Sequence, residues 1–249
     1  MFKYFAGLLC DLSLVIFLPF IRLWKFLDNR EYDTFLFIDK PSIDHGLLLV
    51  HGSGANEGQF LISRKIIDNI LKEKGVECRV YSLDLNGFSA SQYESIDDYA
   101  KKLIGKVKKI EEDGVKKLTI VGHSMGGLVA SHYVENYCTN KQIIKCVCTI
   151  GTPWHGVPLL KYIYGLPFIN SKRYLDMIPN SDFLKQLHEK VYNSNVVYKT
   201  IGSKWDMQVP YGYYSLKGVK NNASNIDTIF GHTSVIMAPS TWKYILKDL

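Results

Sequence analysis

The turn formed by Gly122-His123-Ser124-Met125-Gly126 constrains the fold of this 249-residue chain more than any other segment. An apolar run at 118–121 precedes it and a helix-prone run at 128–137 follows it, which predicts a strand, a sharp turn and a helix. In a Gly-x-Ser-x-Gly turn in this context, the glycines leave room for a serine in a strained conformation, and its hydroxyl points away from the sheet. The pattern therefore predicts that Ser124 is a nucleophile. The alternative is a glycine-rich turn in which the serine is structural.

A serine hydroxyl reacts slowly at neutral pH unless a histidine removes its proton and a carboxylate orients that histidine. Asp206 lies in a loop after the β-rich run at 196–201, and we predict that it is the orienting acid. His232 lies in a loop before a helix predicted at 239–247, and we predict that it is the base. Asp176, Asp182 and Asp227 are the alternative acids.

Strand-like and helix-like runs alternate along most of the chain, which predicts a mostly parallel sheet flanked by helices. A hydrophobic content of 47% over this length is enough for one domain, assigned to residues 31–249, with a sizeable core. Residues 32–38 give a weaker signal for an edge strand. The predicted strands lie at 47–50, 78–83, 117–121, 143–150 and 196–201, and the predicted helices near 60–74, 95–112 and 125–137.

Three further loops, together with the turn at Ser124, resemble the α/β-hydrolase superfamily, and within it the bacterial-type lipases and esterases. The run Leu-Leu-Leu-Val-His-Gly-Ser-Gly at 47–54 resembles the strand and His-Gly loop of that family. The segment at 84–91 resembles its Asp-Leu-x-Gly-x-Gly-x-Ser loop, from which Phe88-Ser89 departs. The Gly-Thr-Pro-Trp-His-Gly segment at 151–156 resembles the loop after the strand that follows the nucleophile. With Asp206 and His232 included, the resemblance spans residues 45–249.

This resemblance implies an α/β-hydrolase fold and a serine hydrolase that forms an acyl-enzyme on Ser124. Carboxylic esters, above all lipid esters, are the substrates that it favours. The same groups could transfer the acyl chain to an alcohol or cleave a thioester or amide. A non-catalytic, membrane-associated binding protein that keeps the fold is an alternative of another class.

Among the other histidines, His155 is the strongest competitor for the role of base. It follows Thr152-Pro153-Trp154 at the end of a predicted strand, but it precedes Asp206 and so breaks the usual order of serine, acid and histidine. His123 is expected to pack beneath the turn. His45, His132 and His188 precede a strand or lie within helices, where a structural or solvated role is simpler.

Attack of a serine on an ester carbonyl produces an oxyanion, which two backbone N–H groups can stabilise by several kcal/mol. Met125 N–H is one predicted donor, because it follows the nucleophile at a helix N-terminus and the helix dipole favours negative charge there. Ser53 N–H is the second predicted donor, with Gly52 and Gly54 as alternatives. A merely flexible turn is the other interpretation of this loop. It lacks the motifs of a nucleotide-binding loop.

Residues 154–195 interrupt the alternation of strands and helices, and we interpret them as a cap. The segment mixes apolar residues with prolines and then continues as a helix after Ser181. A mobile lid over Ser124 and a static helical hairpin are both compatible with this pattern. The residues predicted to contact substrate from the cap region are Trp154, His155, Tyr162 and Phe168.

Basic residues are concentrated near the predicted site. Between Lys161 and Lys220 there are nine Lys or Arg residues against four Asp or Glu residues, in a chain of net charge +6. A basic catalytic face would favour an anionic membrane surface or phospholipid-like substrates, although an ordinary solvated surface gives the same count. No motif supports nucleic acid binding.

Residues 1–30 form a hydrophobic N-terminal segment whose apolar run at 2–27 is interrupted by Asp11, Pro19, Arg22 and Lys25. We predict a membrane anchor that either spans the bilayer or lies on its surface. The alternatives are a helix packed on the domain and a cleaved signal peptide. The protein is therefore expected to be membrane-associated or cytoplasmic rather than secreted.

The five cysteines do not indicate a disulfide framework, because their number is odd and their positions suit a core. Cys146 and Cys148 are predicted on one face of a buried strand, and Cys138 at the end of a helix. No His/Cys/Asp cluster has the spacing of a metal site, so we expect neither a metal nor an organic cofactor.

Overall fold

The computed structural model describes residues 34–36, 44–85, 94–166, 169–216 and 224–249. The predicted N-terminal anchor, the loop at 86–93 and Phe168 of the predicted cap lie outside these ranges. Within the described ranges, no helix combines the length and the apolar character needed to cross a bilayer.

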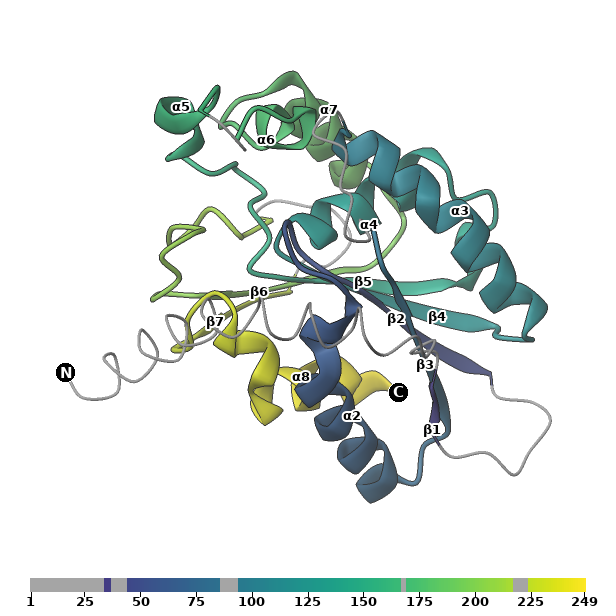
Figure 1. Cartoon of the computed structure of the whole chain (residues 1–249). Helices are drawn as coiled ribbons and strands as arrows, with labels where there is room; N and C mark the ends of the chain where they lie inside the picture. The colour runs from purple at the N-terminus through teal and green to yellow at the C-terminus, as the bar shows by residue number, and fades with distance from the viewer. Residues whose placement is uncertain (1–33, 37–43, 86–93, 167–168, 217–223) are drawn as a thin grey trace.

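A seven-stranded sheet forms the centre of the domain (Figure 1). Its order is β1-β3-β2-β4-β5-β6-β7, and every neighbouring pair is parallel except β1 with β3. The predicted α/β-hydrolase architecture, with a mostly parallel sheet, is thereby confirmed. The strands are β1 (Thr34–Leu36), β2 (His45–Val50), β3 (Cys78–Leu83), β4 (Lys117–His123), β5 (Ile144–Ile150), β6 (Tyr198–Ser203) and β7 (Ser224–Thr228).

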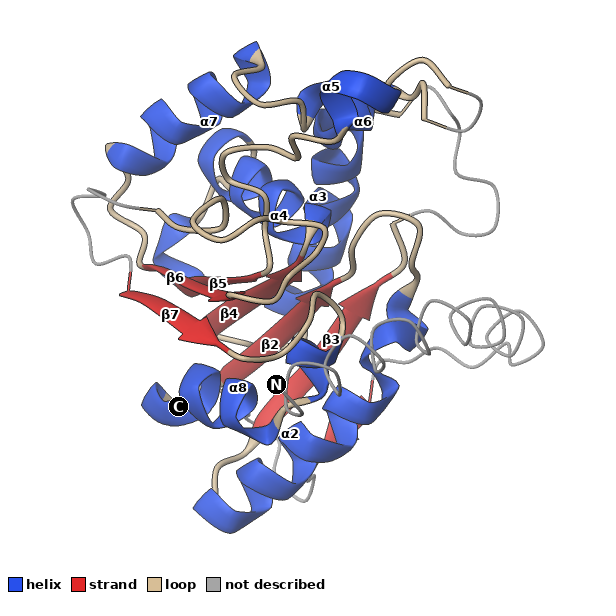
Figure 2. Ribbon diagram, turned by 90° about the vertical axis from the view of Figure 1, so that its left-hand side faces the viewer, coloured by secondary structure: helices blue, strands red, loops and turns tan. Residues whose placement is uncertain are grey.

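Helices cover both faces of the sheet, with α2 and α8 on one face and α3 and α4 on the other (Figures 1 and 2). Short 3-10 helices connect several of these elements. The helices that cover the two faces are α2 (Leu61–Lys74), α3 (Ile96–Glu112), α4 (Met125–Asn136) and α8 (Pro239–Ile245), and the 3-10 helices are η1 (Glu57–Phe60), η2 (Lys141–Ile143), η3 (Ser234–Met237) and η4 (Leu246–Asp248).

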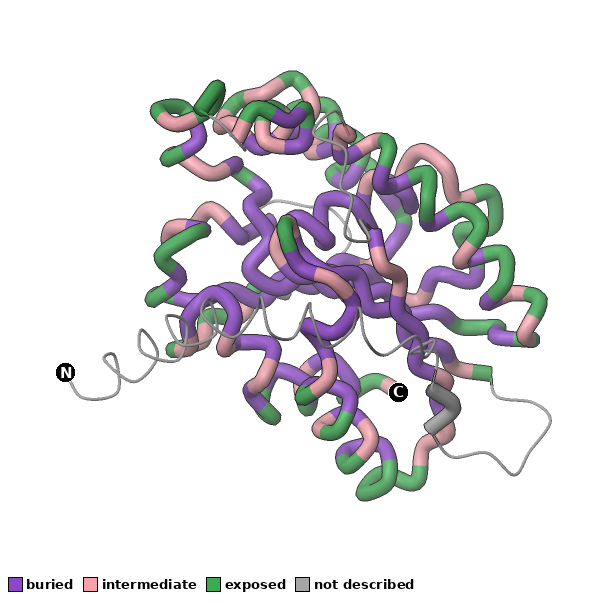
Figure 3. The backbone as a smooth tube through the Cα atoms, in the orientation of Figure 1, coloured by how far each residue is buried: buried purple, intermediate pink, exposed green. Residues whose placement is uncertain are grey.

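Two hydrophobic clusters, one on each side of the sheet, form the core (Figure 3). Strand β2 contributes to both, because Leu48 and Val50 point to one cluster while Leu47 and Leu49 point to the other. All four side chains are fully buried. A parallel strand covered on both faces has a continuous apolar sequence, which is why the run at 47–50 predicted this strand correctly.

The helix boundaries agree with the sequence signals. Helix α3 begins at a capping box, in which Ser95 Oγ accepts a hydrogen bond from Asp98 N–H and the Asp98 side chain accepts one from Ser95 N–H. Helix α2 ends at Gly75, whose φ of 63° is the left-handed conformation that favours glycine at a helix C-terminus. These helices match the predicted ranges to within a residue.

Strand β7 is the element that the prediction missed. It carries Ser-Asn-Ile-Asp-Thr and lies at the edge of the sheet, where residues 225–230 alternate between exposed and half-buried. A half-exposed edge strand has no continuous apolar run to indicate it. Strand β1 confirms the weaker prediction of an edge strand, and β6 lies two residues later than predicted.

The segment between β5 and β6 forms three helices that lie together on the side of the sheet covered by α3 and α4 (Figure 1). The last of them begins after Ser181 as predicted, and Ser181 Oγ accepts a hydrogen bond from Leu184 N–H. This helix packs against α4, while the one before it packs against α3. The three are α5 (Leu160–Ile163), α6 (Lys172–Asp176) and α7 (Asp182–Tyr192).

The cysteines in the described ranges are free thiols. Cys146 and Cys148 lie buried on β5 with their Sγ atoms 3.6 Å apart, as expected for residues on one face of a strand. Burial raises the pKa of Cys78 to about 12.

Candidate active site

Ser124 lies at the sharp turn between β4 and α4, at the carboxyl end of a central parallel strand. Its φ of 55° and ψ of −128° are strained for a residue with a side chain. Two hydrogen bonds hold this conformation. Ser124 N–H donates to Ile150 O at 2.8 Å, and Thr152 Oγ1 donates to Ser124 O at 3.0 Å.

The glycines of the turn are required by close backbone contacts. A Cβ atom on Gly122 would lie 2.4 Å from Gly126 O, and a Cβ atom on Gly126 would lie 2.3 Å from Val50 O. Since real Cβ atoms do not approach backbone atoms this closely, neither position can hold a larger residue without displacing the chain. The geometry is the one that the Gly-x-Ser-x-Gly pattern predicted.

The structure brings the predicted acid and base together. His232 Nδ1 donates to Asp206 Oδ2 at 2.6 Å, and only 4% and 1% of the two side chains are exposed. Asp206 Oδ1 accepts two further hydrogen bonds, from Gln208 N–H at 2.8 Å and Val209 N–H at 2.7 Å. The carboxylate is therefore fixed in place, and the other ring nitrogen of His232, Nε2, is left to interact with a third group.

Gly151 connects this pair to the serine turn. A Cβ atom at Gly151 would lie 3.3 Å from both Asp206 Oδ2 and His232 Nδ1. The carbonyl oxygen of the preceding residue, Ile150, accepts the hydrogen bond from Ser124 N–H. Among the described residues, none forms a hydrogen bond with the Ser124 hydroxyl. Catalytic hydrogen bonds are often long before substrate binds.

His123 packs beneath the turn, as predicted, and it contacts the loop of His232. Its Nε2 atom lies 2.8 Å from His232 O, and the two rings are 4.8 Å apart. Burial lowers the pKa of His123 to about 3, so its ring is neutral in the folded protein at ordinary pH.

The loop after β2 lies against the serine, since a Cβ atom on Gly52 would be 3.0 Å from Ser124 Cβ. Ala55 N–H donates to Gly52 O and closes a turn around Ser53. The amide groups of Ser53 and Met125 have no hydrogen-bond partner among the described residues. Both are thus available to an incoming oxygen.

His51 fixes this loop, a role that the sequence motif alone did not reveal. The ring is fully buried, and its Nδ1 donates to Gly52 O at 2.8 Å. Its Nε2 accepts from Leu85 N–H at 2.9 Å. The two bonds set the tautomer of His51 and tie the loop after β2 to the end of β3.

The predicted substrate contacts of the cap region need correction at Trp154. Its indole is fully buried and donates to Thr149 Oγ1 at 3.1 Å, so it is a core residue. His155 is exposed, and its Nε2 lies 3.1 Å from Ser215 O, whereas the histidine bonded to Asp206 is His232. Tyr162 on α5 is 83% exposed, and Phe168 lies outside the described residues.

The alternative acids are engaged elsewhere. Asp176 accepts a hydrogen bond from Ile96 N–H at 2.9 Å, at the start of α3. Asp227 accepts from the hydroxyls of Tyr211 and Tyr214. Asp182 is exposed in the first turn of α7. None of the three is hydrogen-bonded to His232.

Tyr174 on α6 is a candidate that the sequence did not indicate. Its hydroxyl accepts a hydrogen bond from Ser53 Oγ at 3.3 Å, next to a predicted oxyanion donor. No sequence signal could have found it, because the contact depends on how the inserted helices sit on the domain.

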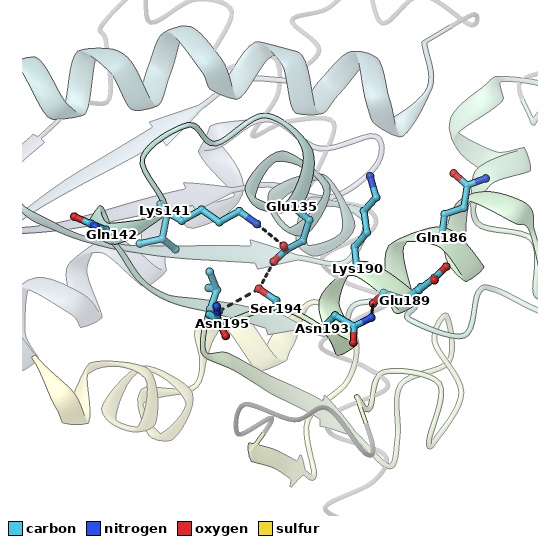
Figure 4. Close-up of a pocket in the computed structure, with 11 residues that line it drawn as sticks. Glu135, Lys141, Gln142, Gln186, Glu189, Lys190, Asn193, Ser194 and Asn195 are labelled. Atoms are coloured by element: carbon cyan, nitrogen blue, oxygen red, sulfur yellow. Dashed lines mark hydrogen bonds and ion pairs between the residues drawn. The ribbon is translucent and has the colours of Figure 1, made fainter.

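A separate groove of about 830 Å³ lies at the far end of α4 from Ser124, beside η2 and the end of α7 (Figure 4). Its one deeply buried carboxylate, Glu135, already binds Lys141 at 2.6 Å and Ser194 and Tyr198 at 2.7 Å. The carboxylate of this groove is therefore used in structural contacts, and the groove is separate from the site at Ser124. Within the described ranges, no group of three or more His, Cys, Asp or Glu side chains could hold a metal ion.

A family model described as alpha/beta hydrolase fold matches residues 47–173. Among curated proteins, the chain is 27% identical over 149 residues to monoacylglycerol lipase abhd6-A of Xenopus laevis, covering 57% of this chain and 42% of that protein. It is 29% identical over 123 residues to protein phosphatase methylesterase 1 of Bos taurus, covering 47% and 31%. The match thus spans less than half the length of either relative.

Solved structures share the fold over most of the chain. Est1E from Butyrivibrio proteoclasticus, solved with ferulic acid, aligns with a TM-score of 0.65 at 13% identity, covering 88% of this chain and 94% of that one. The Bacillus licheniformis lipase BlEst2 aligns with a TM-score of 0.64 at 16% identity, covering 85% and 94%.

Proposed function

The chain belongs to the α/β-hydrolase fold family, and on that basis we propose that it is a serine hydrolase that cleaves carboxylic esters through an acyl-enzyme on Ser124. The observation that carries the proposal is the buried pair of His232 and Asp206, 2.6 Å apart, beside a serine held in a strained turn. This combination is the arrangement that activates a hydroxyl for attack.

In the first half of the reaction, Ser124 Oγ attacks the ester carbonyl carbon while His232 Nε2 takes the hydroxyl proton. Asp206 stabilises the resulting imidazolium through the Nδ1 hydrogen bond. The carbonyl oxygen becomes an oxyanion that accepts hydrogen bonds from the amides of Ser53 and Met125, each worth about 3 kcal/mol of barrier lowering. His232 then gives its proton to the leaving alcohol.

In the second half, His232 removes a proton from water, and the hydroxide oxygen attacks the acyl carbon. The acid is released when the proton returns to Ser124 Oγ. Because His123 is neutral in the folded protein, it adds no positive charge next to His232 when the imidazolium forms. That absence of repulsion supports the assignment of His232 as the base.

The surface around this site supports lipid esters as substrates, presented at an anionic membrane surface. Most of the exposed large apolar side chains of the described residues lie on two segments, the cap and the loop after β6. His155 N–H donates to Tyr213 O at 3.0 Å and so joins the two segments. These side chains are Leu159, Tyr162, Tyr164, Leu166 and Leu175 at 159–175 of the cap, and Trp205, Met207 and Tyr211 on the loop.

Exposed lysines lie among these apolar residues: Lys161 and Lys172 on the cap and Lys204 on the loop. Apolar side chains that enter the lipid and lysines that meet anionic headgroups together favour binding to such a surface. The sequence similarity to a monoacylglycerol lipase is compatible with this substrate class.

A fluorophosphonate probe tests the proposal, because it labels only an activated serine. We expect labelling of the wild-type protein, none of Ser124→Ala, and none or very little of His232→Ala. His155→Ala is the matched control and should label like wild type. Turnover that survives in Ser124→Ala, or labelling at another residue by mass spectrometry, would refute the assignment. Product analysis with added alcohol separates hydrolysis from acyl transfer.

A further inference from the structure

We propose that the Tyr174 hydroxyl is a third donor of the oxyanion hole, supplied by the cap. This inference rests on the proposed function and adds a catalytic residue to it. Its starting point is the 3.3 Å hydrogen bond between Ser53 Oγ and Tyr174 Oη, which places a cap side chain against the loop that supplies an oxyanion amide.

The hydrogen bond between Ser53 and Tyr174 leaves one of their two hydroxyl protons unused. Each of the two hydroxyls carries one proton, and the hydrogen bond between them uses one of the two. When Ser53 Oγ donates, the O–H of Tyr174 has no acceptor among the described residues and can turn to a substrate oxygen. Ser53 Oγ lies within the same residue as the Ser53 amide. A substrate oxygen that reaches that amide is therefore close to a phenol hydroxyl that can donate a hydrogen bond to it.

The fold holds Tyr174 in this position through its neighbour Arg173. The Arg173 guanidinium is buried, donates to Tyr99 Oη at 2.6 Å and lies 5.0 Å from the centre of the Tyr174 ring. Arg173 N–H also donates to Glu94 O at 3.1 Å. A buried cation against both the ring and the body of the domain restricts where the phenol can point.

A second contact fixes the other end of α6. The Asp176 carboxylate accepts a hydrogen bond from Ile96 N–H at the N-terminus of α3, where the helix dipole favours negative charge. Helix α6 is thus attached to α3 on both sides of Tyr174. Preorganised donors of this kind stabilise charge that develops in the transition state, since they need no reorientation.

Tyr174→Phe tests this role while keeping the ring that Arg173 contacts. With a short soluble ester, we expect kcat to fall by about tenfold to a hundredfold and KM to stay within about twofold. An alkylboronic acid, whose adduct with Ser124 mimics the oxyanion, should bind more weakly by the same factor as the loss in kcat/KM. Tyr192→Phe, on a half-exposed tyrosine at the end of α7, is the matched control and should leave all three values unchanged.

Two results would overturn the inference. One is a kcat for Tyr174→Phe within about twofold of wild type. The other is a loss in kcat without any loss of boronate affinity, which would indicate a displaced cap. Thermal unfolding of the variant verifies that it is folded. A wild-type protein without esterase activity or probe labelling would contradict the proposed function itself, so the two failures are distinguishable.

Discussion

His123 Nε2 donates a hydrogen bond to the backbone carbonyl of His232, 2.8 Å away. His123, the residue before the proposed nucleophile, thus holds in place the loop that carries the proposed base, His232. Because the carbonyl can only accept, the bond fixes the proton of neutral His123 on Nε2. The placement of His232 therefore depends on a ring that must stay uncharged.

This dependence predicts a loss of stability in mild acid. Burial lowers the pKa of His123 to about 3, whereas an unfolded histidine titrates near its ordinary pKa of 6.5. Between these values the unfolded chain binds more protons, so the free energy of unfolding falls as pH drops below 6.5, by an amount on the order of 2 kcal/mol at pH 5. Above pH 6.5 the contribution is complete.

Urea unfolding of wild type and His123→Gln between pH 5 and 8 measures this effect. The Gln amide can still donate to His232 O but does not titrate in this range. We expect the stability of the variant to depend less steeply on pH than that of wild type. Parallel curves for the two proteins would show that another group is responsible.

Asp206→Asn should lower kcat by about a thousandfold or more, because the neutral amide neither fixes the ring tautomer of His232 nor stabilises its charged form. The two backbone bonds to Oδ1 can persist, so the fold should be retained. Asp227→Asn is the matched control, since Asp227 binds tyrosine hydroxyls instead of His232. Steady-state ester hydrolysis compares them; equal losses in both variants would contradict the assignment.

Gly126→Ala should destabilise the protein by about 3 kcal/mol or more, because the new Cβ atom would lie 2.3 Å from Val50 O in a rigid core. Gly105→Ala is the matched control, because the same substitution should there raise the stability of the protein. Gly105 lies within α3, and outside the backbone of its own helix no atom of the described residues lies within 4 Å of the position that its Cβ would take, so alanine should stabilise by about 0.5–1 kcal/mol. Chemical denaturation measures both; a mild effect at Gly126 would argue against the observed turn.

Replacing Tyr162 and Met207 together by serine should weaken binding to anionic lipid vesicles by about tenfold, because two side chains exposed by 83% and 76% lose their apolar contact with lipid. Hydrolysis of short soluble esters should not change. Ile104→Ser, at a 45% exposed residue of α3, is the control and should bind vesicles like wild type. Vesicle cosedimentation gives the comparison, and undiminished binding of the double variant would exclude this surface.

The parts of the molecule that the sequence predicted are those governed by local patterns. The buried run at 47–50 indicated β2, and the glycines around Ser124 indicated a turn that their backbone contacts require. Asp206 was predicted from a loop after a strand, and His232 from a loop before the last helix. The sequence thus predicted that Asp206 would pair with His232, but not the two backbone hydrogen bonds that also hold the Asp206 carboxylate.

The remaining features depend on contacts between distant segments. Trp154 lies in the Gly-Thr-Pro-Trp-His-Gly loop, yet its indole turns into the core and donates to Thr149 Oγ1. The apolar character of a tryptophan does not distinguish a core residue from one that lines a pocket. The approach of Tyr174 to Ser53 follows from the attachment of α6 to α3 through Arg173 and Asp176. No local pattern encodes such a contact.

The strand order has a consequence for how reactivity arises while the protein is being made. Ser124 follows β4, a central strand, whereas His232 follows β7, the edge strand that pairs with β6 alone. The helix after His232, α8, packs against α2 from the early part of the chain. In a nascent chain in which β7 has not yet formed, the proposed base is therefore not in place beside Ser124. On the proposed mechanism, hydrolysis should therefore begin only when β7 and α8 have docked on the rest of the domain.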